Sequence, residues 1–242
     1  MKEQLRKIIT VFLSISGYVP HHATVLRTLS ILISLAFVYY ISEFQSENPQ
    51  LSAAYFVIST LLYIGFIFLV LPENGLRHWF ISRYGEERGY RVYEAILSVL
   101  FFHSGASVGY VSLTTSGEIF RSLNQDLLFW LALIISGVGL TVKVWSAKVV
   151  GVDIYYWKDM FLGRKITSFA VEGPYKYLSN PMYGIGQLQA YGVAIMFGSA
   201  KGLIAALIYQ CAIFIFYHSA EKNFIQRVYL SKNRAALSTE KI

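Results

Sequence analysis

The chain has 242 residues, of which 55% are hydrophobic and only 14% are charged. That composition excludes an ordinary soluble domain, in agreement with a mean hydropathy of +0.48. Apolar stretches long enough to cross a bilayer recur along the chain, so we expect an all-α integral membrane protein. The single cysteine, Cys211, excludes a disulfide bond within the chain.

The N-terminal segment, residues 1–17, has a basic start followed by a short apolar run. It lacks a good small-residue cleavage site, so we interpret it as an amphipathic piece in the cytosol or at the interface rather than a cleaved signal peptide. Six membrane spans are then predicted in chain order: 25–41, 51–71, 95–115, 126–149, 182–200 and 202–219. The last two are expected to form a tight hairpin around the sequence GSAKG.

The distribution of basic residues predicts the orientation of these spans. Of the 21 Lys and Arg residues, 19 fall on the side that holds both termini, and Arg121 and Lys201 fall on the other. Because basic loops stay in the cytosol, both termini are expected there. The net charge of +7 then attracts the cytosolic face to anionic lipid headgroups. The basic residues are dispersed among membrane loops, so no nucleic-acid partner is expected.

No internal repeat and no low-complexity linker divides the chain. We distinguish N-terminal membrane helices over residues 1–125, which hold about three spans with few polar residues inside them. Residues 126–230 form a membrane core that carries the unusual chemistry. Residues 231–242 are expected to be a cytosolic tail.

The sequence GPYKYLSNPMY precedes the fifth predicted span. Gly173 and Pro174 predict a turn. Asn180 is a strong N-cap and Pro181 suits the first helical position, so a helix is expected to begin at Pro181. Its free backbone N–H groups would offer an anion site at the cytosolic interface. The alternative is a simple turn into the bilayer, and the local sequence taken alone favours this alternative.

Three further features carry candidate chemistry. Gly137 and Gly139 in the fourth span allow close approach, either by a ligand or by another helix. Glu221 follows the last span, where a carboxylate either binds ribose hydroxyls or an ammonium group or remains a solvated helix-end charge. Asp159 lies in a loop of aromatic residues that form an interfacial belt or hold a cation. The histidine spacing predicts no metal site.

The predicted topology brings these features together. Gly139, Asp159, Asn180 and Glu221 all lie at or near the cytosolic face, and they come from consecutive elements. Neighbouring helices can unite them in a polar pocket that is open to the cytosol and walled by membrane helices. Such a pocket suits a soluble cofactor and a lipid substrate.

Four sequences in order, ISGVGL, GPYKYLSNPMY, YGVAIMFGSAKGL and AEKNFIQRVY, carry a resemblance to a known family. Residues 127–230 resemble the phospholipid methyltransferases. These are the integral-membrane phosphatidylethanolamine N-methyltransferases, which are related to isoprenylcysteine carboxyl methyltransferases. The first three spans are not clearly covered, and residues 126–230 are therefore interpreted as a methyltransferase-like core.

The resemblance implies S-adenosylmethionine as the methyl donor. A GxG sequence and a Glu-Glu pair bind it in this family, which assigns Gly137, Val138 and Gly139 to the cofactor. Glu221 matches the second half of the pair, whereas Ala220 stands where the family has its first Glu.

The resemblance also gives a role to the turn that precedes the fifth predicted span. Asn180 and Pro181 are expected to serve the cofactor pocket, with Tyr175 and Tyr183 as candidate walls. Ser179-Asn180-Pro181 is closer to the phosphatidylethanolamine branch than to branches that carry Arg-His-Pro.

The expected reaction transfers methyl groups to the amine of phosphatidylethanolamine or its methylated derivatives. Asp159 or Glu221 is expected to accept the proton that the amine loses. The protein is expected in a bacterial inner membrane or the endoplasmic reticulum, with its site facing the cytosol.

Three alternatives remain open at this stage. One is a carboxyl methyltransferase acting on prenylated cysteine, and another is an NADPH-dependent sterol or enone reductase of similar architecture. The third is a non-catalytic lipid-binding relative, in which Ala220 marks a decayed site. No feature of the sequence predicts an oligomeric state.

Overall fold

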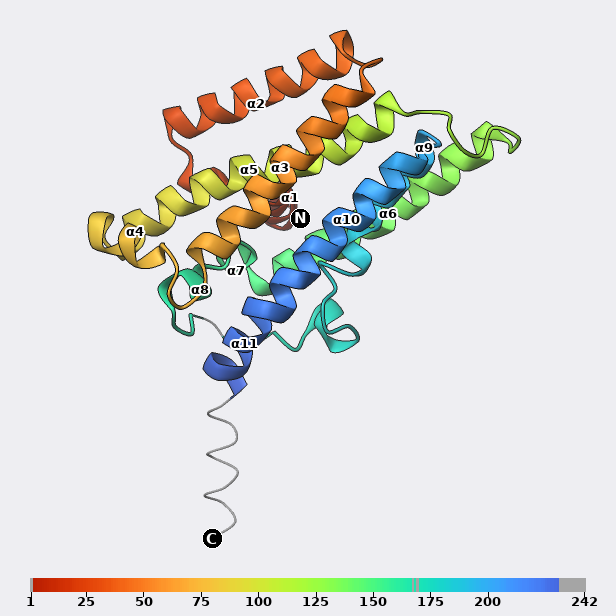
Figure 1. Ribbon diagram of the computed structural model, residues 1–242. Coiled ribbons are helices and arrows are strands. Elements are labelled where there is room, and N and C mark those ends of the chain that lie inside the picture. The colour runs from red at the N-terminus through yellow and green to blue at the C-terminus, as the bar shows by residue number, and fades with distance from the viewer. Residues whose placement is uncertain (1, 167, 169, 231–242) are drawn as a thin grey trace.

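The computed structural model describes residues 2–166, 168 and 170–230 (Figure 1). The predicted cytosolic tail, residues 231–242, lies outside the described residues. The described part consists of helices and connecting turns and contains no strand, which confirms the predicted all-α class.

Within the described residues, five helical segments are long and apolar enough to cross a membrane. They are α2 (Val25–Phe44), α3 (Pro49–Val70), α5 (Glu86–Thr114), α6 (Gln125–Val150) and Ala200–Leu230, which opens with α10 (Ala200–Phe216) and includes α11 (Lys222–Ile225). Shorter elements flank them: α1 (Lys2–Ile15), η1 (Pro20–His22), α4 (Arg77–Tyr84), α7 (Val152–Tyr155), α8 (Lys158–Leu162), η2 (Gly173–Lys176), η3 (Ile185–Gln187) and α9 (Leu188–Met196).

The predicted fifth span, residues 182–200, holds only η3 and α9. Together these cover about 18 Å, against about 30 Å of hydrocarbon, so this segment is too short to cross a bilayer as a helix. The described helices therefore account for five spans by length. The orientation of the termini stays a prediction.

The predicted helix start at Pro181 is wrong, because the α-helix begins at Leu188. Gly184 is the physical reason, since its ψ of −103° interrupts the helical hydrogen-bond ladder. The backbone carbonyl of Asn180 instead accepts from the Gly184 N–H within a turn. The turn predicted at Gly173 and its neighbouring proline is confirmed as η2.

Side-chain caps explain where four of the long helices start. The side chains of Thr24, Asn48, Asn124 and Ser199 each accept a hydrogen bond from the backbone N–H three residues later. These residue types are preferred N-caps because they satisfy a donor that the first turn leaves free. Ser199 lies in the tight turn between α9 and α10, so the predicted hairpin around GSAKG is confirmed.

The predicted amphipathic N-terminal piece is the helix α1. It packs through Val11 and Ile15 against Ala147 of α6. Leu5 and Phe12 remain exposed. An exposed apolar stripe on a helix with a basic start suits the membrane interface.

Both predicted parts of the chain share one core. In Figure 1 α3 and α5 run side by side, and α9 packs against both α6 and α10. The largest cluster of buried apolar side chains joins residues of α3 and α5 to residues of α8 and α10. The division into residues 1–125 and 126–230 stays a prediction.

A buried acid ties the N-terminal turn to α5. The Glu94 side chain is completely buried. Its Oε2 accepts from Arg27 Nη1 at 2.9 Å and lies 2.6 Å from His22 Nδ1, while the Tyr90 hydroxyl donates to Oε1 at 3.2 Å. Removing one partner of such a buried pair typically costs about 3–5 kcal/mol, so this cluster holds the start of α2 in place.

The most extensive helix contact joins α6 to α9. A Cβ atom added to Gly139 of α6 would lie 2.4 Å from the Gln189 backbone nitrogen. A Cβ atom added to Gly192 of α9 would lie 2.7 Å from the Ala132 backbone oxygen. Only glycine permits this approach, and small residues drive such packing in membranes.

We predict opposite effects for the two glycines of α6. Gly139→Ala is expected to destabilise the protein by about 1–3 kcal/mol, because the added methyl group meets the α9 backbone. Gly137→Ala is the matched control. A Cβ there meets nothing within 4 Å, so its gain in helix propensity should keep or raise stability. Thermal unfolding in detergent measures both, and equal shifts would contradict the close contact.

Candidate functional site

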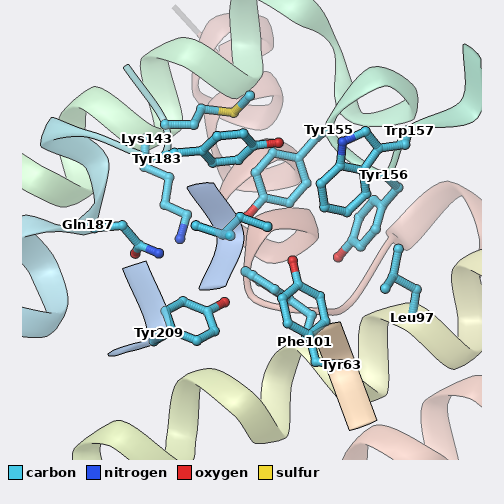
Figure 2. A pocket seen from close by; sticks show the side chains of 12 residues that line it. Tyr63, Leu97, Phe101, Lys143, Tyr155, Tyr156, Trp157, Tyr183, Gln187 and Tyr209 are labelled. Atoms are coloured by element: carbon cyan, nitrogen blue, oxygen red, sulfur yellow. The ribbon is translucent and has the colours of Figure 1, made fainter. Parts of the chain in front are cut away.

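A cavity of about 440 Å³ lies among the membrane helices (Figure 2). The walls come from α3, α5, α6 and α10, from the segment between α7 and α8, and from the turn before α9. Most of the lining is aromatic: Tyr63, Phe101, Tyr155, Tyr156, Trp157, Tyr183 and Tyr209.

Lys143 and Gln187 supply polar groups on one side of this cavity, opposite Trp157 and Tyr156 (Figure 2). The Lys143 side chain is only 5% exposed. Its ammonium lies 5.3 Å from the centre of the Phe101 ring. Among the described residues, no carboxylate and no hydrogen-bond acceptor partners that ammonium.

Glu221 is connected to the cavity through its aromatic wall. The Tyr183 hydroxyl donates to Glu221 Oε2 at 2.9 Å. The Trp157 indole lies near the same carboxylate. Figure 2 shows the Tyr183 hydroxyl directed toward the Trp157 side. Two predicted site residues, Tyr183 and Glu221, are therefore brought together.

Tyr175 lies near the same acid. Its buried hydroxyl has no hydrogen-bond partner within the described part of the chain. Burial raises the pKa of this phenol, and the nearby Glu221 charge raises it further. The hydroxyl therefore stays protonated and is available as a donor.

Asp159 is buried in α8 and does not line the cavity. Its carboxylate accepts from the Tyr229 hydroxyl at 2.9 Å and from the Met160 backbone N–H at 2.8 Å. Burial raises the pKa of the carboxyl group above its usual value, and the hydrogen bond from Tyr229 opposes that rise.

The predicted cofactor glycines lie outside the cavity lining. Gly139 packs against the α9 backbone, whereas a Cβ at Gly137 would face open space. Val138 is 46% exposed. The packing interpretation accounts for Gly139, and the role of the three residues in cofactor binding stays a prediction.

The remaining predicted residues border the site. Asn180 and Pro181 form the turn that precedes Tyr183. Ala220 lines a second cleft, of about 700 Å³, beside Arg77 and Arg227. An acid at position 220 would therefore face this cleft rather than the aromatic cavity.

One histidine cluster was not predicted from spacing. His21, His22 and Asp153 bring potential ligand atoms within 4.8 Å of one another. His22 already contacts Glu94, and Asp153 accepts from Lys158 at 3.2 Å. These contacts give the cluster a structural explanation, and we assign no metal to it.

Sequence reasoning missed several lining residues. Lys143 falls within the predicted fourth span, 126–149, but was not predicted as a site residue, and α6 carries it to the cavity. A single charge within an apolar helix was the signal that could have found it. Tyr63, Phe101 and Tyr209 gave no signal, because aromatic residues are ordinary components of membrane spans.

Comparisons with known proteins agree with the motifs in the second half of the chain. The family model described as phospholipid methyltransferase matches residues 127–232. No solved structure matches the chain significantly.

Relatives named phosphatidylethanolamine N-methyltransferase match parts of the chain. The protein from Kluyveromyces lactis is 27% identical over 100 residues, or 41% of this chain and 12% of the relative. The one from Talaromyces marneffei is 33% identical over 92 residues, or 37% and 9%. The one from Botryotinia fuckeliana is 23% identical over 217 residues, or 83% and 21%. The chain thus spans about a fifth or less of the length of these relatives. Residues 127–232 are therefore similar to the phospholipid methyltransferase family.

Proposed function

We propose that the protein transfers methyl groups from S-adenosylmethionine to the amine of phosphatidylethanolamine or its methylated derivatives. The observation that carries this proposal is the aromatic cavity backed by Glu221 through Tyr183, two residues that lie within the segment that matches the family. The asymmetric distribution of Lys and Arg supports a site on the cytosolic side of the membrane. We propose that this membrane is a bacterial inner membrane or the endoplasmic reticulum.

Methyl transfer forms a bond from nitrogen to carbon as the bond from sulfur to carbon breaks. S-adenosylhomocysteine leaves, and the amine loses one proton. The protein must align the two partners, which supplies about 7–11 kcal/mol in favourable cases. The faces of Trp157 and Tyr183 suit the cationic sulfonium and the cationic amine product, because aromatic rings attract cations when water is excluded.

Of the two acids proposed as proton acceptors, Glu221 is better placed. It reaches the cavity wall through Tyr183. Asp159 is already engaged by Tyr229 and by backbone, away from the cavity lining. We therefore propose Glu221 as the acceptor, directly or through water, and give Asp159 a supporting structural role.

The first test is cofactor binding. S-adenosylhomocysteine is expected to raise the unfolding temperature of the purified protein, whereas NADPH is not, because a bound ligand stabilises the native state. Stabilisation by NADPH alone would instead favour the reductase alternative.

Glu221→Gln is expected to weaken S-adenosylhomocysteine binding about tenfold, since it removes a charged hydrogen-bond partner of the cavity wall. Glu118→Gln is the control. Glu118 pairs with Lys201 at the start of α10, about 30 Å away along the helix. Calorimetric titration measures both, and unchanged affinity in the Glu221 variant would favour a non-catalytic lipid-binding relative.

Radiolabelled methyl transfer to phosphatidylethanolamine tests the reaction and the two acids together. Glu221→Gln is expected to lower the transfer rate at least 100-fold, in the range of general-base losses, about 10²–10⁴. Asp159→Asn is expected to retain most of the rate. Prenylated cysteine in parallel reactions distinguishes the carboxyl methyltransferase. Absence of transfer to any lipid amine would refute the proposal.

Asp159 also predicts a pH dependence of stability. Because its folded pKa is raised, its contribution is complete below the usual Asp pKa of about 4 and is lost as pH rises through the raised value. The unfolding temperature of the wild type should therefore fall relative to Asp159→Asn as the pH rises above about 4. A constant difference over that range would contradict the raised pKa.

A further inference from the structure

Lys143 lacks the partner that a buried charge requires. Lys143 belongs to α6, and its side chain is buried among the helices with 5% of the residue exposed. No acid pairs with its ammonium among the described residues. Burial of an unpaired charge is costly, and such groups within membrane helices are commonly functional. The Phe101 ring, at 5.3 Å, offsets part of the cost. A ligand anion would offset the rest.

The surroundings hold this lysine in position. A Cβ at Gly186 would lie 3.4 Å from Lys143 Cβ, so the turn before α9 packs directly on the lysine stem. The next residue, Gln187, is 4% exposed and lines the same side of the cavity. Its amide can donate two hydrogen bonds. Lysine and glutamine together therefore form a donor set suited to an oxygen anion.

The opposite side of the cavity is suited to a cation rather than an anion. Trp157 presents its aromatic ring there, the Tyr183 hydroxyl is directed toward that side, and Glu221 accepts a hydrogen bond from that hydroxyl. Figure 2 places Trp157 across the cavity from Lys143. The cavity is therefore polarised, with a cation on one side and an acid behind aromatic rings on the other. This arrangement is complementary to a zwitterion.

We propose that Lys143 and Gln187 form an anion subsite that holds the phosphate diester of the lipid headgroup, while the amine lies against Trp157 and Tyr183. The choice of acceptor rests on the proposed function. The phosphate and amine of an ethanolamine headgroup are joined by a short ethylene bridge, so anchoring the phosphate also directs the nitrogen. The carboxylate of the methyl donor has related anion chemistry, and the experiment separates the two sources.

The first arm measures binding without turnover. Wild-type protein in detergent is titrated with dihexanoyl phosphatidylethanolamine and with dihexanoylglycerol, which lacks the whole phosphoethanolamine headgroup. Lys143→Gln is expected to lose about tenfold in affinity for the phosphorylated lipid, because a charged hydrogen bond is removed. Affinity for dihexanoylglycerol should not change. Lys143→Arg is expected to retain the preference for phosphate.

Lys148→Gln is the matched control, because it removes the same charge from an exposed position of the same helix. It should bind like the wild type. If Lys143→Gln does not fold, Gln187→Leu provides a second test, with a smaller loss expected for the phosphorylated lipid alone. Equal affinities of wild type, Lys143→Gln and Gln187→Leu for that lipid would overturn the subsite.

The second arm measures the KM for phosphatidylethanolamine and the affinity for S-adenosylhomocysteine. The expected result for Lys143→Gln is a raised lipid KM with unchanged S-adenosylhomocysteine affinity. The reverse pattern would assign Lys143 to the donor carboxylate and overturn the phosphate assignment. If the wild type prefers the phosphorylated lipid in a way that depends on Lys143 but transfers no methyl group, the proposed function would be refuted. The anion subsite would still stand.

Discussion

The close contact between α6 and α9 is the constraint on which the site depends. Gly139 and Gly192 add no side chain of their own between the two backbones. Lipid offers no hydrophobic drive for helices to associate, so close packing of this kind must hold them together. The contact also presses the turn before α9 onto α6, where Gly186 meets Lys143. Lys143 and Gln187 consequently face the same cavity.

Irregular backbone near this contact needs its own partners, because hydrocarbon supplies none. Gln210 of α10 meets that need. Its Nε2 donates to the carbonyl of Tyr183 at 2.8 Å and to that of Gly184 at 3.3 Å, while the Tyr191 hydroxyl donates to its Oε1 at 2.7 Å. The broken helical segment is therefore stabilised by one amide, which also positions Tyr183 near Glu221.

Some parts of the site were accessible from local sequence and others were not. Tyr183 and Glu221 were predicted from separate motifs, and a hydrogen bond joins them. The helix start at Pro181 failed because the N-cap signal did not account for the conformation of Gly184 three residues later. From the sequence alone, the glycine pair of α6 is compatible with helix packing or with ligand binding. The surroundings of Gly139 show that it packs against α9.

By itself the sequence determined the helical membrane class, the asymmetry of basic residues and the order of the family motifs. These depend on composition and on neighbours a few residues apart. Tertiary structure decided which side chains share the cavity and that α9 is short. A uniformly apolar helix has no polar face that fixes its rotation, so contacts with other helices decide it. Lys143 illustrates this: its charge was visible in the sequence, but its position opposite Trp157 required the fold.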